Sequence, residues 1–129
     1  MAENGQQRIL VVDDESSLAR LIQMVMEYQG YVVDWAADGE EALALGRRHE
    51  YAAVICDILM PILDGVELYQ IWQANAPQLA QRVIFVTGGN LGSRTDRFIR
   101  LCGRPCLYKP FDMQELASTI REVAGVYAS

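Results

Sequence analysis

The chain has 129 residues, of which 51% are hydrophobic and 22% charged, and its formal net charge is −6 at pH 7. This length fits one domain with its own core, and the acidic charge argues against nonspecific nucleic-acid binding, which needs a basic surface. No apolar run approaches the roughly 18 residues of a membrane span, and the polar start is no signal peptide. We therefore expect a cytoplasmic protein without a membrane partner, with a polar tail over residues 1–7 and one domain over residues 8–127.

Short apolar runs alternate with segments of helical periodicity along the whole chain. The predicted strands span residues 8–12, 31–35, 51–56, 82–86 and 105–108. Each strand is followed by an amphipathic segment with apolar residues three or four positions apart, as expected for a helix. Five strands alternating with five helices predict an α/β fold with a doubly wound, five-stranded parallel sheet and helices on both faces.

Capping patterns predict where several of these helices begin and end. Asp38 and Asp64 each precede a Glu by three residues, and Ser93 precedes Asp96 at the same spacing. A side-chain oxygen at the cap and an acid three residues later is the capping-box pattern. Gly103 follows the fourth helical segment, where a glycine commonly ends a helix.

Polar side chains follow the predicted strands at their carboxyl ends. Asp13 and Asp14 follow the first strand, Asp57 ends the third, Thr87 the fourth and Lys109 the fifth. Parallel strands bring these ends to one edge of the sheet, where open α/β sheets bind ligands. Three neighbouring carboxylates repel one another, and oxygen ligands without Cys or His favour Mg²⁺. With a cation present, the Asp57 carboxylate can act as a nucleophile toward phosphorus, while Thr87 and Lys109 hold the remaining oxygens.

These motifs resemble those of the receiver domains of two-component response regulators. The matching stretches are Val11-Val12-Asp13-Asp14-Glu15, Asp57-Ile58-Leu59-Met60-Pro61 with Asp64-Gly65, Thr87-Gly88, and Lys109-Pro110-Phe111. They cover nearly the whole chain in the order of the family. The resemblance implies a flavodoxin-like sheet with strand order 2-1-3-4-5 and a cis peptide bond before Pro110.

The resemblance also implies a role for each site residue. Asp57 would accept a phosphoryl group from a sensor histidine kinase or a histidine phosphotransfer protein. Asp14, Asp57 and the carbonyl of Leu59 would bind Mg²⁺, and Asp13 would act on the metal through water. Thr87 would donate a hydrogen bond to the phosphoryl group, and Lys109 would pair with it. Such a domain assists its own phosphorylation and dephosphorylation but is not an enzyme acting on outside substrates.

In this family the signal passes through a conformational change at the face of the fourth helix, fifth strand and fifth helix. The expected recipients are an output domain, a partner protein or a second copy of the chain. This chain departs from the family at Cys106, where receivers usually have Tyr or Phe three residues before the lysine. Tyr108 lies two residues further along, on the same strand face. We therefore expect phosphorylation chemistry to be kept and the aromatic switch to differ.

Arginines recur every three or four residues in and just after the fourth helical segment, at Arg94, Arg97, Arg100 and Arg104. This spacing places them on one helical face. They are either a solvated face or a docking stripe for an acidic partner surface.

Other interpretations of the acidic cluster and of the cysteines remain open. Asp13 or Asp14 could simply cap the first helix. The chain could be a receiver-like docking module that works without phosphorylation. A phosphatase of the haloacid dehalogenase type would need a second acid where this chain has Leu59. The three cysteines form no CxxC pair, so we expect reduced thiols, with Cys56 packed in the core.

Overall fold

A computed structural model of the chain describes residues 5–128. Strands and helices alternate along it. The strands are β1 (Arg8–Val12), β2 (Val32–Ala36), β3 (Ala53–Asp57), β4 (Val83–Thr87) and β5 (Cys106–Tyr108). The helices are α1 (Ser16–Tyr28), α2 (Gly39–Arg48), α3 (Gly65–Asn75), α4 (Pro77–Ala80), α5 (Ser93–Cys102) and α6 (Met113–Ala128).

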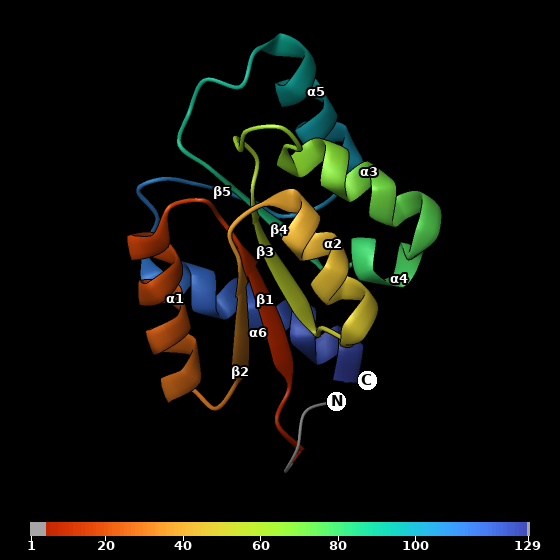
Figure 1. Cartoon of the computed structure of the whole chain (residues 1–129). Helices are drawn as coiled ribbons and strands as arrows, with labels where there is room; N and C mark the ends of the chain where they lie inside the picture. The colour runs from red at the N-terminus through yellow and green to blue at the C-terminus, as the bar shows by residue number, and fades with distance from the viewer. Residues whose placement is uncertain (1–4, 129) are drawn as a thin grey trace.

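The five strands form one parallel sheet in the order β2-β1-β3-β4-β5 (Figure 1). This order confirms the doubly wound fold predicted from the sequence, with five long helices. The short helix α4 was not predicted. It begins at Pro77, whose fixed φ and missing N–H suit the first position of a helix, and it ends after one turn at Ala80.

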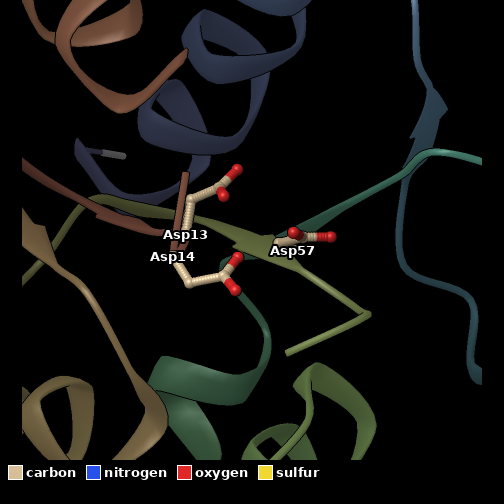
Figure 2. A group of neighbouring side chains, drawn as sticks. All are labelled: Asp13, Asp14 and Asp57. Carbon is tan, nitrogen blue, oxygen red and sulfur yellow. The ribbon is translucent and has the colours of Figure 1, made fainter. Parts of the chain in front are cut away.

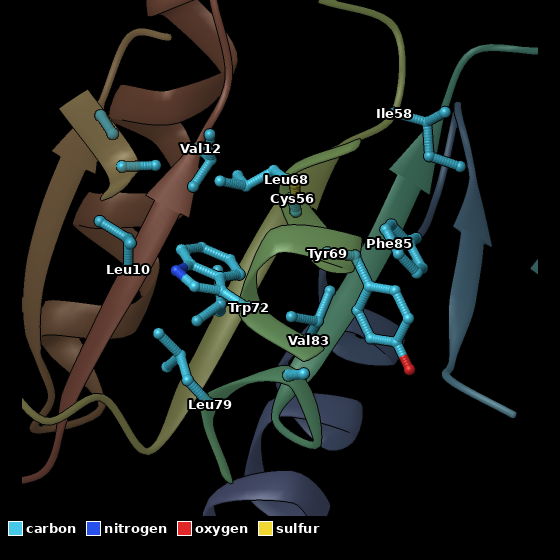
Figure 3. Packing of buried hydrophobic residues seen from close by; sticks show 14 of the residues in the cluster. Leu10, Val12, Cys56, Ile58, Leu68, Tyr69, Trp72, Leu79, Val83 and Phe85 are labelled. Carbon is cyan, nitrogen blue, oxygen red and sulfur yellow. The ribbon is translucent and has the colours of Figure 1, made fainter. Parts of the chain in front are cut away.

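Helices cover both faces of the sheet, and each face has its own apolar core. On one face, α1 and α6 pack residues such as Ile22 and Ile120 against the strands. On the other face, α2, α3 and α5 contribute a larger cluster that includes Trp72 and Tyr69 (Figure 3). All residues of β3 and β4 are buried, as expected for central strands covered on both sides. Among residues 5–128, no helix is long and apolar enough to span a membrane.

The predicted caps are partly confirmed. Asp64 and Glu67 form the complete capping box at the start of α3, and Asp38 accepts a hydrogen bond from the backbone N–H of Glu41. The capping box predicted for Ser93 and Asp96 is wrong. Gly92 occupies the cap of α5 with φ of 79°, where it has no side chain to accept a hydrogen bond, and Ser93 is already helical. The sequence spacing alone could not show this one-residue offset.

A charged network closes the amino-terminal edge of the sheet. Arg8 Nη1 donates to both carboxylate oxygens of Asp34 at 2.9 Å, and the Tyr51 hydroxyl donates to Asp34 Oδ2 at 2.6 Å. Arg82 Nη1 donates to the carbonyl of Tyr51 at 3.1 Å. Tyr51 is fully buried, and the bond to Asp34 gives its hydroxyl a hydrogen-bond partner. The network thus joins β1, β2 and the start of β4 through Tyr51. The predicted tail lies partly outside the described residues, which begin at Gly5; the boundary predicted at residue 8 stays a prediction.

Candidate functional site

Three carboxylates meet at the carboxyl edge of the sheet. Asp13 and Asp14 follow β1, and Asp57 is the last residue of the neighbouring strand β3 (Figure 2). One carboxylate oxygen from each lies within 4.8 Å of the others. Asp13 and Asp57 are buried, whereas Asp14 is exposed. The cluster therefore opens to solvent on the Asp14 side, which leaves a path for a small ligand.

Asp57 is held by the backbone that follows it. Its Oδ1 accepts a weak hydrogen bond, 3.3 Å long, from the backbone N–H of Leu59. The start of α3 packs directly behind it, because a Cβ atom on Gly65 would lie 2.5 Å from the Asp57 carbonyl oxygen. Burial, with the nearby charge of Asp13, raises the pKa of Asp57 to about 6, although Lys109 opposes the shift. In the absence of a bound cation, the ionised form of Asp57 is thus poorly stabilised.

Asp13 is anchored on one side and unsatisfied on the other. Its Oδ1 accepts a 2.8 Å hydrogen bond from the backbone N–H of Glu15, and its carbonyl accepts one of 2.8 Å from the Trp35 indole N–H. Its buried Oδ2 has no hydrogen-bond partner among the described residues. Lys109 Nζ lies 3.5 Å from that oxygen, an ion pair without hydrogen-bond geometry. Burial raises the pKa of Asp13, partly offset by the Glu15 N–H and by Lys109.

Lys109 and Thr87 complete the edge from β5 and β4. Lys109 Nζ lies 3.6 Å from Asp57 Oδ2 as well as close to Asp13, so it faces both buried carboxylates. The backbone N–H of Lys109 donates to the Thr87 carbonyl at 2.7 Å, which ties the two strand ends together. Thr87 is fully buried, and its hydroxyl accepts a long hydrogen bond, 3.5 Å, from the N–H of Gly89. The peptide bond between Lys109 and Pro110 is cis, as the resemblance implied.

The residues at this edge fit a hard divalent cation. The donors are all carboxylate oxygens, and one of them, Asp13 Oδ2, is buried without a hydrogen bond. A single lysine nearby cannot neutralise three acids. A small cation with oxygen preference, such as Mg²⁺, matches this donor set.

The structure thus brings together Asp13, Asp14, Asp57 and Lys109, as the sequence predicted. The capping alternative is wrong for Asp13 and Asp14, because Glu15 occupies the cap of α1 and makes no side-chain capping bond. The roles assigned to all of these residues, and to the Leu59 carbonyl and Thr87, stay predictions.

Sequence reasoning did not find the contact from Trp35 to Asp13. No motif signals it, since it depends on the pairing of β2 with β1, which places Trp35 beside Val11. This indole fixes the backbone that carries the buried acid.

Comparison with known proteins agrees with the motifs. The family model for the response regulator receiver domain matches residues 9–121. The chain is 36% identical over 123 residues to a probable transcriptional regulator, ycf27, of Porphyra purpurea, covering 94% of this chain and 49% of that one. It is 29% identical over 121 residues to the transcriptional regulatory protein ResD of Bacillus subtilis, again with 94% and 49% coverage. The chain therefore spans about half the length of these curated relatives.

Solved structures show the same likeness. A CheY-like receiver domain protein of Methanospirillum hungatei superposes with a TM-score of 0.84 at 27% identity, covering 95% of this chain and 96% of that one. The response regulator protein TrrA of Thermotoga maritima, solved in complex with Mg²⁺-BeF, gives 0.77 at 28% identity, covering 92% and 99%. With a family match over most of its length, the chain belongs to the response regulator receiver domain family.

Proposed function

We propose that the chain accepts a phosphoryl group on Asp57 from a phosphohistidine of a histidine kinase or a histidine phosphotransfer protein. The observation that carries the proposal is the position of Asp57, a residue only 5% exposed, with Asp13, Asp14 and Lys109 around its carboxylate at the open edge of the sheet. Burying such a group is costly unless it serves a reaction or a ligand. A neighbour solved with Mg²⁺ and beryllofluoride supports the same chemistry.

The site residues can support this transfer by position and charge. An oxygen of Asp57 attacks the phosphorus, the phosphorus–nitrogen bond of the donor breaks, and the donor histidine keeps the electron pair. Lys109, which faces Asp57 Oδ2, pairs with the incoming negative charge, and the Thr87 hydroxyl becomes a donor to a phosphoryl oxygen. Asp13, Asp14, Asp57 and the Leu59 carbonyl would hold Mg²⁺, whose charge neutralises the transferring group.

Transmission of the signal would require α5 or β5 to change conformation when the phosphoryl group is bound. Thr87 links the site to β5 through the hydrogen bond from the Lys109 N–H to its carbonyl. On β5 the usual aromatic residue is replaced by Cys106, which is half-buried, while Tyr108 is exposed at the strand end. The output is therefore proposed to pass through the β4–α5 loop and α5, toward an output domain, a partner protein or a second copy of the chain.

The experiment is intact-mass measurement after incubation with acetyl phosphate, with Mg²⁺ or with EDTA. The wild-type chain should gain one phosphoryl group only with Mg²⁺, and Asp57→Ala should gain none. Asp64→Asn is a matched control, because Asp64 is a nearby acid that caps α3 and does not belong to the cluster. It should be phosphorylated like the wild type.

A phosphoryl gain in Asp57→Ala would contradict the proposal. So would no gain in the wild type with either acetyl phosphate or a phosphorylated histidine protein. The latter result would favour the docking module that works without phosphorylation.

A further inference from the structure

A separate cleft with a mixed polar and apolar lining lies at the amino-terminal edge of the sheet, at the opposite end from the carboxylate cluster. It has a volume of about 500 Å³ and is bordered by the end of α4, the turn between α5 and β5, and α6. Its lining includes the polar side chains of Gln78, Gln81, Arg82, Arg104 and Glu122, together with Gly103 and the apolar side chains of Pro105 and Val123. A space of this size accommodates a small molecule.

Arg104 is the unusual member of this lining. The sequence placed it in the arginine stripe of α5, but its guanidinium turns to the sheet, where Nε donates to the Val83 carbonyl at 2.9 Å. The side chain is half-buried, and this burial lowers the pKa of Arg104. Within the described part of the chain, no carboxylate lies within ion-pair distance of it. A partly desolvated cation without a counter-ion is stabilised by any anion that reaches it.

The charges around Arg104 favour an anion in this cleft. Arg82 lines the same space and is fixed through the hydrogen bond from its Nη1 to the Tyr51 carbonyl. Glu122, exposed on α6, is the one acid that the described residues contribute to the lining. Among the described residues, the lining thus contains two guanidinium groups and one carboxylate, in a chain whose net charge is −6. Gln78 and Gln81 add amide groups that donate and accept hydrogen bonds.

We propose that this cleft binds a small phosphate-bearing molecule. Arg104 and Arg82 donate hydrogen bonds to the phosphate oxygens, for which the planar guanidinium group is well suited. Gln78 and Gln81 contact the rest of the molecule, because the cleft is larger than a phosphate ion. The site is separate from Asp57, so binding requires neither Mg²⁺ nor phosphorylation.

The test is an NMR titration of the ¹⁵N-labelled chain in EDTA, which keeps anions from binding through a metal at the carboxylate cluster. The probes are inorganic phosphate, pyrophosphate and AMP. We expect saturable shifts of the backbone amides of Gln81, Gly103 and Arg104, in the wild type and in Asp57→Ala alike. Tighter binding of AMP than of phosphate would identify a phosphate ester as the ligand class, and equal binding would identify the free oxyanion. No saturable shift at tens of millimolar of any probe would overturn the proposal.

Substitutions inside and outside the cleft test whether the probes bind there. Arg104→Gln should weaken binding about tenfold, the loss of one charge-assisted contact. Arg100→Gln is the matched control on the preceding helix α5, since Arg100 is exposed and pairs with Asp96 at 3.3 Å. The Arg100→Gln variant should bind each probe with the affinity of the wild type. Glu122→Gln should tighten binding by removing the opposing charge.

One further variant guards against a folding defect in Arg104→Gln, which loses the contact to Val83. Gln81→Glu adds a negative charge to the cleft and leaves Arg104 in place, so it should weaken binding with an unchanged melting temperature. Unchanged affinity in both Arg104→Gln and Gln81→Glu would contradict the assignment.

Discussion

The two edges of the sheet both hold carboxylates, half-buried Asp34 at one and buried Asp13 and Asp57 at the other, and their charges are compensated differently. At the amino-terminal edge, Asp34 receives two hydrogen bonds from Arg8 and one from the Tyr51 hydroxyl. At the carboxyl edge, Asp13 and Asp57 share one lysine at 3.5 and 3.6 Å, and Asp13 Oδ2 has no hydrogen bond among the described residues. The same fold thus contains one satisfied network and one that is left incomplete.

This difference separates a structural role from a functional one. A satisfied, half-buried ion pair that also holds a buried phenol has little to gain from a ligand, and breaking it destabilises the fold. An incompletely compensated cluster of carboxylates destabilises the protein until a cation or a phosphoryl group binds. The free energy gained on that binding can then drive a change of conformation. The comparison therefore predicts opposite stability effects for acid removal at the two edges.

The largest effect is expected for Asp34→Ala. It leaves the Arg8 guanidinium and the buried Tyr51 hydroxyl without their shared acceptor, which should lower the free energy of unfolding by about 3 kcal/mol. Urea denaturation followed by circular dichroism measures this change. Tyr51→Phe, which removes only one hydrogen bond, should cost about 1 kcal/mol. A loss in Asp34→Ala no larger than that of Tyr51→Phe would show that the pairing of Arg8 with Asp34 does not stabilise the fold.

At Asp57, by contrast, we expect the charged carboxylate to destabilise the fold, and the pH dependence of stability should reveal this. Its pKa is raised from 3.8 to about 6 in the folded state, so the folded protein binds more protons than the unfolded chain between these values. The contribution of Asp57 is favourable below pH 4 and is lost as the pH rises through about 6, a fall of about 2 to 3 kcal/mol in EDTA.

The contribution of Asp57 is isolated by comparison with Asp57→Asn. Other acids titrate in both proteins, so the difference in unfolding free energy between variant and wild type should grow from pH 4 to pH 7 in favour of the variant. A difference that stays constant with pH would contradict the raised pKa. Saturating Mg²⁺ should shrink the gap by stabilising the wild type.

Asp13→Asn should be stabilising in EDTA at pH 7. The amide oxygen can keep the hydrogen bond from the Glu15 N–H, while the unsatisfied charge at Oδ2 disappears. We expect the unfolding free energy to rise by about 1 kcal/mol or slightly more. Asp14→Asn is the control: its exposed side chain should change stability by less than about 0.5 kcal/mol. A destabilised Asp13→Asn would mean that Lys109 already compensates the acid.

The sequence predicted the carboxylate cluster well because it depends on strand order and strand ends. Apolar runs followed by acids place Asp13, Asp57 and Lys109 at one edge as soon as the sheet is parallel. The network around Asp34 was not predicted. It depends on the pairing of Arg8 with Val32 and on the direction in which Tyr51 points from the start of β3, and neither leaves a signal in local periodicity.

The arginine pattern on α5 shows the same limit. Helical spacing correctly predicts that Arg94, Arg97 and Arg100 are exposed on the helix. Gly103 was also correctly predicted to end α5, but neither the spacing nor the glycine shows that Arg104 then turns toward the sheet and donates to the Val83 carbonyl. Because α5 ends before Arg104, three of the four arginines lie on the exposed surface of the helix and Arg104 lines the cleft.

The carboxyl edge also contains backbone strain, and this gives the smallest predicted effect. Ile62 is 97% exposed and has φ of 70°, in a turn closed by a 2.8 Å hydrogen bond from the Leu63 N–H to the Pro61 carbonyl. A β-branched residue rarely adopts this conformation, and its exposed side chain gains no packing in return. Ile62→Asn should raise the unfolding free energy by about 1 kcal/mol, because Asn tolerates positive φ.

Two further substitutions at this position identify strain as the cause. Ile62→Val keeps the β-branch and should leave stability unchanged. Ile62→Gly removes the strain but gives the unfolded chain more freedom, so it should gain less than Ile62→Asn. All three variants should accept a phosphoryl group from acetyl phosphate like the wild type, since Ile62 does not belong to the carboxylate cluster. Equal stability of the Asn and Val variants would show that the turn holds no strain, and would leave the uncompensated carboxylates as the source of instability at this edge.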